Sequence, residues 1–491
     1  MKLKRLLIPV SLGLGLALLW MVGSLAFTAT AAPGPREVAE ISADPVTYHV
    51  DASVTGGAGD GSTWADAFGT LQDALDAAQP GDQIWVAEGI YTPTQGSGCN
   101  ATFQLPQGVA IYGGFGGAEG DLSERHWSEH LTVLSGDVDG NDNTENDQGM
   151  DNGIVERSAD IDGHNACHVV SSSGVTESAV LDGFVITAGD ARDLDPNGGG
   201  MHNSDGGPAL VNIIFSGNRA QTGDGGALYN GSYGAMTLSK VVFSGNSARR
   251  GGGMFNGSTA TLTNVMLSGN DALDTGAGVH NDSGGQLTVL NSTFSNNNAV
   301  TTGGALYNNG GNADLVNSLL WGDSNEITND EGAVTTVSYS DVQYAYAGGS
   351  WDLSLGTDGG GNMDAPPQFK DADGYDDVAG TLDDELILLA GSPCIDTGTD
   401  TGAPSEDFEG DPRPWDLTPE DNDDVDIGAD EFSNCCDLNT DGGAIDIDDV
   451  QKIANHWREP ADHPPYDSDG DGTTTIVEIL RVTANWGGTC P

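Results

Sequence analysis

The sequence predicts an all-β protein built as a parallel β-helix, and three observations lead to this fold class. Five short segments of one type recur, and their closing asparagines lie 27, 26, 25 and 27 residues apart. A second apolar segment, close to Leu-x-Asn-apolar-apolar-Phe, follows each of them. Glycine supplies 73 of 491 residues, and no window shows the apolar i, i+3, i+4 spacing of a helical repeat. Short strands and Gly/Asn turns at a fixed period are typical of a solenoid with stacked coils.

The regular repeats occupy residues 198–322. The first type of segment reads GGGMHN (198–203), GGALYN (225–230), GGMFN (252–256), GAGVHN (276–281) and GGALYN (303–308). The second type covers 210–215, 238–243, 262–267, 289–294 and 315–320. Two strands per coil are therefore expected, one from each type of segment.

The N-terminus predicts secretion. The basic stretch MKLKR precedes an apolar run at 6–27, and Ala29-Thr30-Ala31 follows, which is typical of a signal peptide with its cleavage site. We expect a signal peptide at 1–31 and a linker at 32–45. The mature protein should be extracellular, either secreted or held at the cell surface, with no membrane insertion after cleavage. The run is long enough to span a bilayer, so an uncleaved anchor is the alternative.

The composition restricts partners and compartment. Sixteen Lys and Arg residues stand against 74 Asp and Glu residues, a net charge of −58. A surface this negative repels nucleic acid and anionic membranes, so neither is expected as a partner. Six cysteines fit an oxidising compartment. We expect a Cys99–Cys167 disulfide and a second one that joins Cys435 or Cys436 to Cys490.

An amphipathic helix is expected to cap the first coil. Phe68, Leu71, Leu75 and Ala78 lie on one face of this helix, and Pro80-Gly81 ends it. The first coil of a solenoid has open strand edges, which such a helix covers. Strands are predicted at 83–92, 109–112, 131–134 and 180–186. Residues 323–432 are expected to form the C-terminal coils and cap, so that the β-helix spans 46–432.

Several motifs within 46–432 resemble known bacterial families. GGAL (225–228, 303–306) and FSGN (215–218, 243–246) resemble the repeats of polymorphic outer-membrane-protein β-helices. AIYGGFGG (110–117), LSGDVDG (134–140), PPQFKDADG (366–374) and SPCIDTG (392–398) resemble the secreted choice-of-anchor Q proteins. The resemblance implies a right-handed, pectate-lyase-like solenoid, and it leaves the activity open because a fold does not fix a function.

One outer face is expected to carry a column of aromatic side chains. Strand residues alternate between the interior and the outside, so the residue before each closing asparagine points outward. Stacking the coils aligns five predicted ligand-binding residues: His202, Tyr229, Phe255, His280 and Tyr307. Such a column is a typical sugar-binding surface; alternatively, the rings only stack on each other and shield the sheet. The two histidines are too far apart to share a metal ion.

Asparagines repeat at two further positions, one with Asn212, Asn264, Asn291 and Asn317 and one with Asn218, Asn246, Asn270 and Asn297. Amides at tight bends bond their own backbone and the identical residue one coil away. Lys240 replaces asparagine in the first set and is the candidate catalytic base of a lyase, with Arg219, Arg249 and Arg250 close in sequence. The alternative is a surface lysine without a catalytic role.

Hydrolysis has less support from the repeats. A glycoside hydrolase needs two carboxyl groups about 5–9.5 Å apart. The solenoid shows no clear pair of acids at matching positions of adjacent coils, although acids occur at 182, 190, 193, 195, 205 and 224.

Residues 433–491 predict a small helical calcium-binding domain. The loop 467–478 fits D-x-[DN]-x-[DN]-G-x5-E, with ligands from Asp467, Asp469, Asp471, Thr473 and Glu478. The loop 437–449 has one extra residue and offers Asp437, Asn439, Asp441 and Asp449, with Asp448 as the alternative closing ligand. Two such loop–helix units resemble a type I dockerin, which implies two Ca²⁺ ions and a cohesin-like protein partner.

Three functions are compatible with these features. The first is a secreted calcium-binding protein that grips extracellular polysaccharide or a cell-surface glycan, or acts as a surface adhesin, and is tethered by the dockerin-like domain. The second is a polysaccharide lyase or O-glycosyl hydrolase in polysaccharide catabolism. The third is a structural spacer.

Overall fold

Stacked coils form three parallel sheets in the computed structural model, which describes residues 45–93, 98–146, 151–192, 195–414 and 424–432. Sheet A contains β1 (Thr47–Val50), β2 (Gln83–Ala87), β3 (Gly89–Tyr91), β5 (Ala110–Phe115), β6 (Thr132–Ser135), β8 (Val180–Thr187), β10 (Ala209–Ser216), β13 (Ala235–Ser244), β16 (Thr259–Ser268), β19 (Gln286–Leu290), β20 (Thr293–Ser295), β23 (Asn312–Val316), β24 (Leu319–Trp321), β26 (Val334–Ser338), β27 (Asp341–Val342) and β30 (Thr357–Asp358). Sheet B contains β4 (Phe103–Gln104), β7 (Val170–Ser172), β9 (Met201–Asn203), β12 (Leu228–Asn230), β15 (Met254–Asn256), β18 (Val279–Asn281), β22 (Leu306–Asn309) and β25 (Ile327–Asp330). Sheet C contains β11 (Arg219–Asp224), β14 (Ser247–Arg250), β17 (Asp271–Thr275) and β21 (Asn298–Ala299).

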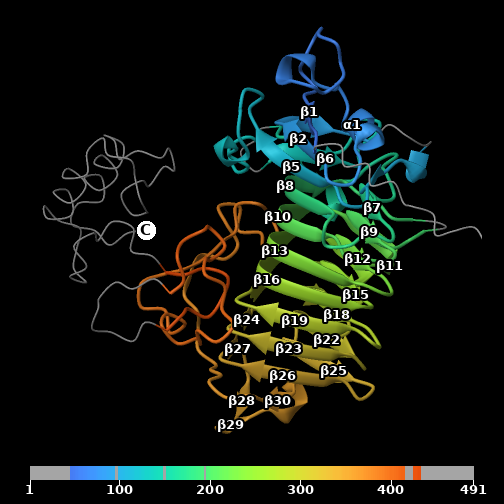
Figure 1. Cartoon of the computed structure of the whole chain (residues 1–491). Coiled ribbons are helices and arrows are strands. Elements are labelled where there is room, and N and C mark those ends of the chain that lie inside the picture. Colours follow the sequence, from blue (N-terminus) through green and yellow to red (C-terminus); the bar gives the residue numbers. More distant parts are fainter. Residues whose placement is uncertain (1–44, 94–97, 147–150, 193–194, 415–423, 433–491) are drawn as a thin grey trace, which may run out of the picture. The chain divides into compact units, whose positions relative to one another are not determined.

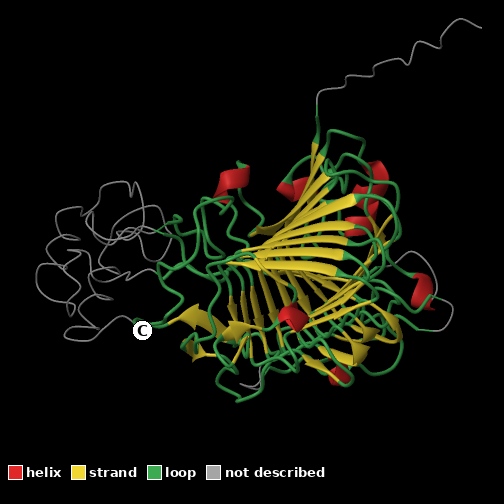
Figure 2. Ribbon diagram, turned by 90° about the horizontal axis from the view of Figure 1, so that it is seen from below, coloured by secondary structure: helices red, strands yellow, loops and turns green. Residues whose placement is uncertain are grey.

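The parallel β-helix is confirmed. Each strand of a sheet pairs in parallel with the equivalent strand of the next coil, as between β10 and β13 and between β12 and β15. Figure 1 shows this stacking in chain order, and Figure 2 shows the strands of successive coils lying over one another. Connections between parallel strands of one sheet are nearly always right-handed, which is the sense that the resemblance implies.

The first coil carries the expected helix. Helix α1 (Leu71–Ala77) begins after Thr70, whose Oγ1 accepts a hydrogen bond from the Asp73 backbone N–H, and buries Leu71 and Leu75 against the first strands. Phe68 lies before the helix and pairs with Val50 in an isolated bridge. The predicted strand at 83–92 is two strands, β2 and β3. Short 3-10 helices occur at η1 (Trp64–Asp66), η2 (Gly98–Asn100), η3 (Leu122–Glu124), η4 (Ser158–Asp160) and η5 (Leu353–Leu355).

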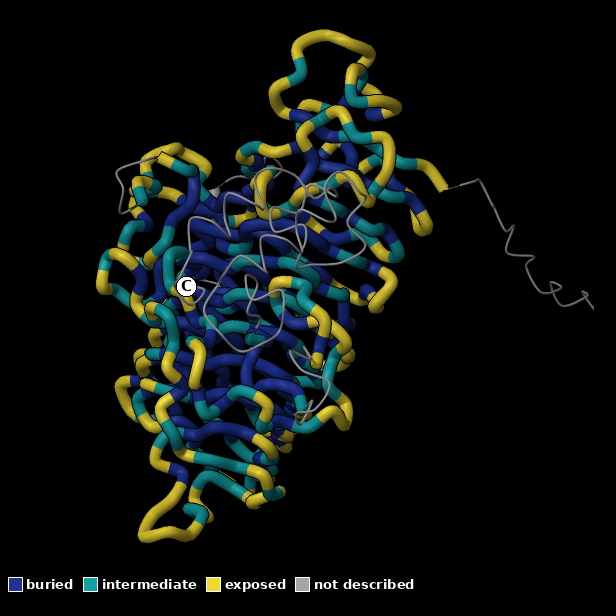
Figure 3. Tube along the Cα trace, turned by 90° about the vertical axis from the view of Figure 1, so that its left-hand side faces the viewer, coloured by how far each residue is buried: buried dark blue, intermediate teal, exposed yellow. Residues whose placement is uncertain are grey.

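The core fills the interior of the coils. Matching positions of sheet A stack one apolar side chain above another, and the rings of Phe215 and Phe243 lie 5.1 Å apart, nearly parallel. Sheet B adds Met201, Leu228, Met254, Val279 and Leu306 to the same core. Figure 3 shows the coils as buried and many of the turns as exposed. Each fully buried side chain of this size stabilises the fold by about 2–3 kcal/mol.

Two ladders of buried amides run beside the apolar core. In one, the amide of each asparagine donates to the Oδ1 of the next, in the order Asn203, Asn230, Asn256, Asn281 and Asn308. In the other, the order is Asn218, Asn246, Asn270 and Asn297, and the ladder ends on Asp323. The predicted contact of identical residues one coil apart is therefore confirmed for this second ladder.

The bend in the middle of the long strands requires a left-handed backbone. It is occupied by Asn212, Lys240, Asn264, Asn291 and Asn317, with φ between 44° and 56°. Asparagine tolerates this conformation better than other non-glycine residues, because its short amide bonds locally. The predicted turn position is confirmed, and Lys240 is the exception in it.

Of the C-terminal coils and cap predicted over 323–432, the coils extend through β25, β26, β27 and β30, whereas the described residues from 366 to 432 do not continue them. The chain contains a hairpin, β28 (Tyr346–Ala347) and β29 (Ser350–Trp351), and later pairs β31 (Phe369–Asp371) with β32 (Glu385–Leu388), both antiparallel. From there it returns along the outer side of sheet A, as the orange segment of Figure 1 shows. Ser244 Oγ donates to the Thr381 carbonyl, and Gly428 N–H donates to the Asn317 carbonyl. We call the described residues of this part, 366–414 and 424–432, the return segment.

The reason for this return lies in sheet A. In the run apolar-apolar-Phe, the phenylalanine points inward, so the second apolar residue points outward and needs a cover. Leu319 is such a residue, and it is fully buried against Leu388, Cys394 and Ile427 of the return segment. The return segment therefore replaces solvent over an apolar outer face.

Candidate functional site

A cavity of about 420 Å³ remains between sheet A and the return segment, and we call it the flank cavity. Its floor is formed by Ile214, Val242 and Met266, the outward residues of β10, β13 and β16. The loop between β5 and β6 contributes one wall, and the return segment contributes the other. The remaining lining residues are Trp127, Ser128, Leu131, Ser244, Ser268, Thr381, Leu382, Asp384, Glu385, Leu386, Ile387, Phe408 and Glu409.

Asp384 is a buried acid on this wall. Its Oδ2 accepts hydrogen bonds from Ser268 Oγ and from the Gly380 backbone N–H, whereas its Oδ1 is buried and has no hydrogen-bond partner among the described residues. Burial raises the pKa of Asp384 to about 7, and the nearby acids Asp383 and Asp376 act in the same direction. A carboxyl group with a pKa near neutrality is suited to proton transfer at physiological pH.

Further acids lie next to the cavity. Carboxylate oxygens of Asp407, Glu409 and Asp430 lie within 4.8 Å of one another, and Asp407 accepts hydrogen bonds from the backbone N–H groups of Gly410, Asp411 and Glu431. Burial raises the pKa of Asp430 to about 7 and that of Asp407 above its usual value. Oxygen ligands of this kind are those that Ca²⁺ prefers.

The sequence did not predict Asp384 or Glu409 as site residues. Both residues lie after the regular repeats at 198–322, so the repeat spacing does not predict which coil they contact. The sequence nevertheless contains a signal for a covered outer face of sheet A. Segments of the second type contain two adjacent apolar residues, and one of the two points outward and must be covered.

The aromatic column is confirmed as a stack. His202, Tyr229, Phe255, His280 and Tyr307 pair in register on sheet B, and consecutive ring centroids lie 5.1 or 5.2 Å apart. The column is not evenly exposed, however, which favours the alternative that the rings stack on each other and shield the sheet. Phe255 is 4% exposed and His280 is 1% exposed, so only the rings toward the two ends of the column are accessible.

Sheet C explains why the middle of the column is covered. The guanidinium of Arg250 lies 5.2 Å from the ring centroid of Phe255, and its Nε and Nη2 donate to the two oxygens of the Asp224 carboxylate. His280 Nδ1 lies 3.0 Å from Thr275 Oγ1 at the end of β17. Side chains at the ends of sheet C strands, directly before the aromatic segments in the chain, thus cover these rings.

The structure does not bring together the proposed lyase groups. Lys240 lies on sheet A with its Nζ 3.3 Å from Glu406 Oε2. Arg219, Arg249 and Arg250 lie on sheet C, where they pair with Asp190 or Asp224. Asp182, another acid of the solenoid, pairs with Arg125 at 2.6 Å.

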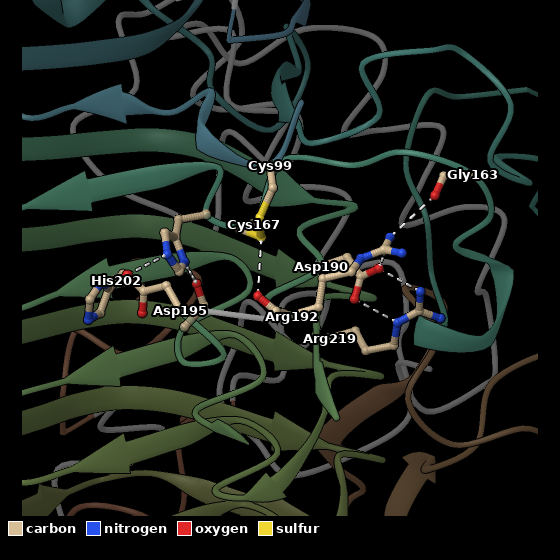
Figure 4. Close-up of a disulfide and its surroundings, with 10 residues drawn as sticks. Cys99, Gly163, Cys167, Asp190, Arg192, Asp195, His202 and Arg219 are labelled. Atoms are coloured by element: carbon tan, nitrogen blue, oxygen red, sulfur yellow. Dashed lines mark hydrogen bonds and ion pairs between the residues drawn. A yellow bond between two sulfur atoms is a disulfide. The ribbon is translucent and has the colours of Figure 1, made fainter. Parts of the chain in front are cut away.

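The Cys99–Cys167 disulfide is confirmed, with the two Cα atoms 4.7 Å apart. Figure 4 shows this disulfide together with Arg192, Asp195 and His202. The predicted calcium ligands Asp437, Asn439, Asp441, Asp449, Asp467, Asp469, Asp471, Thr473 and Glu478 lie outside the described residues, as do Cys435, Cys436 and Cys490.

One comparison with known protein families agrees with the repeat. The model of the Chlamydia polymorphic membrane protein repeat matches residues 212–231, which include one FSGN and one GGALYN segment. No curated protein matches the chain. A matching solved structure is the crystal structure of pectate lyase Pel9A, at 13% identity and a TM-score of 0.39, which covers 80% of this chain and 97% of that chain. Among the described residues, no helix is long and apolar enough to span a membrane.

Proposed function

We propose that this chain is a secreted, surface-associated β-helix protein that binds extracellular polysaccharide in the flank cavity. The observation that carries the proposal is the lining of that cavity. The aromatic residues Trp127 and Phe408 line the same hollow of about 420 Å³ as the polar residues Ser268 and Asp384. Sugar rings pack their C–H faces on aromatic rings and bond hydroxyl and carboxyl groups, so both kinds of contact are provided.

Three features of the chain support the surface location. Residues 1–31 have the pattern of a signal peptide. The family model that matches residues 212–231 describes a repeat of membrane proteins. The dockerin-like domain at 433–491 would tether the β-helix to a cohesin-like partner when its two loops hold Ca²⁺. An adhesin role follows if the bound glycan belongs to another cell.

The binding proposal is tested with residues 32–491 in Ca²⁺ against a panel of neutral and uronate polysaccharides. Trp127→Ala should abolish retention on the polysaccharide that the parent chain binds. Tyr229→Ala combined with Tyr307→Ala, which removes the accessible tyrosines of the aromatic column, should leave retention unchanged. The reverse pattern would assign the glycan to the column, and retention that survives all three substitutions would refute both surfaces.

A polysaccharide-degrading enzyme, a hydrolase or a lyase, is the second candidate, and the environment of Asp384 favours it. This carboxyl group lines the cavity, and its pKa is about 7, so it can donate or accept a proton near neutral pH. The same panel is followed for new reducing ends and for the absorbance of unsaturated uronates. Product formation by the parent chain would make the protein an enzyme, and a decrease of roughly 100-fold or more in Asp384→Asn would assign proton transfer to this carboxyl group. Absence of product with intact binding leaves binding as its work.

The tether is tested separately. Glu478→Gln removes the bidentate ligand that should close the second calcium loop. We expect this variant to bind one Ca²⁺ fewer and to lose its cohesin-like partner, while polysaccharide retention stays unchanged. An unchanged Ca²⁺ stoichiometry would remove the dockerin-like interpretation of that loop.

A further inference from the structure

Two imidazole rings and one carboxylate converge beside the disulfide, at the N-terminal end of the aromatic column. His168 precedes β7, His202 lies in β9, and Asp195 lies in the turn between β8 and β9. Asp195 Oδ2 is 3.3 Å from His168 Nε2 and 3.8 Å from His202 Nδ1. One potential ligand atom of each residue lies within 4.8 Å of those of the other two. We call these three residues the His–Asp cluster.

The orientation of His168 is fixed by the backbone. Its Nδ1 lies 2.9 Å from the Gly198 carbonyl oxygen, which can only accept, so this nitrogen carries the hydrogen. The side chain of His168 is 12% exposed, and its Nε2 points toward Asp195. A histidine that donates its other N–H to a backbone carbonyl is the usual arrangement of a metal ligand, because the bond fixes the tautomer and the ring.

The cluster has an excess of lone pairs at its centre. In the neutral form of His168, the Nε2 lone pair faces a carboxylate oxygen that is also an acceptor. The ring centroids of His168 and His202 are 4.8 Å apart, so a second imidazole adjoins the same carboxylate. A metal cation shared by the three side chains would be bound by lone pairs from all of them.

The distances fit a small transition-metal ion. Ligands at about 2.0–2.1 Å from a tetrahedral Zn²⁺ lie roughly 3.3 Å from each other. The observed 3.3 Å and 3.8 Å are close to this value, so small side-chain shifts would close the shell. Two imidazoles and one carboxylate suit Zn²⁺ and its neighbours in the first transition row, whereas Ca²⁺ takes oxygen ligands.

The surroundings leave one coordination position open. A hollow of about 290 Å³ lies against the cluster, and it is lined by Cys99, Asn100, Thr102, Cys167, His168, Arg192 and Asp195. The Cys99–Cys167 disulfide joins two of these wall residues covalently. The side chain of Arg192 on the same wall is 41% exposed and carries a positive charge. Three protein ligands and an open position beside a cavity are typical of zinc sites that bind a water or a substrate oxygen.

We propose that His168, Asp195 and His202 form a site for one divalent transition-metal ion, whose open position takes a water or an anionic oxygen ligand from the adjoining hollow. The sequence register did not predict this site, because it places Ser171, not His168, opposite His202. The site is independent of the flank cavity and of the calcium loops at 433–491.

The experiment counts Zn²⁺ bound by residues 32–491 after equilibrium dialysis in physiological salt and excess Ca²⁺, with accessible thiols alkylated. The excess Ca²⁺ competes with Zn²⁺ for sites made only of oxygen ligands, such as surface acids and the calcium loops. The Zn²⁺ that remains bound therefore reports a site with nitrogen ligands. The parent chain should bind one Zn²⁺ that Asp195→Asn and His202→Phe lose, with affinity lowered by more than roughly 100-fold. Phenylalanine keeps an aromatic ring at position 202, and the next two positions of the column also hold aromatic residues, Tyr229 and Phe255.

A matched control is His130→Gln, which removes a histidine paired with a single carboxylate, Glu88, at 2.8 Å. This variant should bind Zn²⁺ as the parent chain does. With Co²⁺ in place of Zn²⁺, visible absorption of the parent chain should show nitrogen and oxygen ligands in low coordination, and this spectrum should be absent in Asp195→Asn. Equal Zn²⁺ uptake by the folded parent chain and the folded Asp195→Asn variant, or no uptake by the parent chain, would overturn the proposal.

Discussion

Lys240 occupies the left-handed bend of sheet A at φ 56°, and its Nζ lies 3.3 Å from Oε2 of Glu406 in the return segment. Asparagine holds the same bend at Asn212 and Asn264 in the coils on either side, with φ of 50° and 53°. A left-handed backbone costs about 1–2 kcal/mol for an ordinary side chain. The ion pair with the return segment gives this lysine a structural contact, which differs from the role of a catalytic base.

Lys240→Asn tests this explanation. Asparagine relieves the cost of the bend, while the lost ion pair contributes at most about 1 kcal/mol because Glu406 is largely exposed. We expect the free energy of unfolding to stay within about 1 kcal/mol of the parent value or to rise. Any polysaccharide-degrading activity should be unchanged. The measurements are the thermal midpoint by circular dichroism and the product assay, and loss of product with an unchanged midpoint would restore Lys240 as a base.

Asn246→Ala should destabilise the solenoid strongly. Its amide is fully buried and donates to the Phe215 carbonyl at 2.9 Å and to Asn270 Oδ1 at 3.0 Å, and its own Oδ1 accepts from Asn218. Alanine leaves these buried partners unpaired, at a cost of about 2–3 kcal/mol. Thermal unfolding of both proteins measures the loss. The matched control is Asn298→Ala on the exposed side of sheet C, which should change the midpoint little.

The repeat made the solenoid predictable from sequence. Equal spacing places Tyr229 against His202 and Phe255, and the pairing register agrees. The same reasoning found the amide ladder at Asn218 and the bend at Asn212, because each depends only on which residue recurs at a given position of the coil.

Contacts between distant segments were not predictable in this way. The return segment meets sheet A through pairs such as Ser244 with Thr381, which are 137 residues apart, and no period relates them. Burial of Phe255 depends on Arg250, a side chain that alternation alone does not place over the ring. The flank cavity arises from contacts between distant segments, and the His–Asp cluster depends on side-chain directions outside the repeat register, so both candidate sites required the structure.

The return segment should become less stable as the pH rises. Burial raises the pKa of Asp384 and Asp430 to about 7 and that of Asp426 to about 8, whereas an aspartate in an unfolded chain titrates near 3.9. The stability that these protonated groups contribute is complete below about pH 4 and is lost as the pH rises through the folded values. Hydrogen exchange of peptides from 366–432, corrected for intrinsic rates, should show falling protection up to about pH 8.

Asp384→Asn is the control for this pH dependence. The amide does not titrate, so the decrease in protection around pH 7 should be smaller in this variant than in the parent chain. Peptides from β13 and β16 should show much less change over the same range. Equal protection of the return segment at acid and neutral pH would contradict the raised pKa values.

Removal of the Cys99–Cys167 disulfide should destabilise the N-terminal coils. The bond closes a loop between residues 68 apart in sequence, and chain entropy predicts that losing such a link costs about 4 kcal/mol. We expect Cys99→Ala combined with Cys167→Ala to lower the thermal midpoint of the β-sheet signal. A reducing agent should lower the midpoint of the parent chain by a similar amount, and the double variant should respond less, because only bonds elsewhere in the chain remain to be reduced. If the double variant and the parent chain melt together, the link contributes little, and the wall of the hollow beside His168 is held by packing alone.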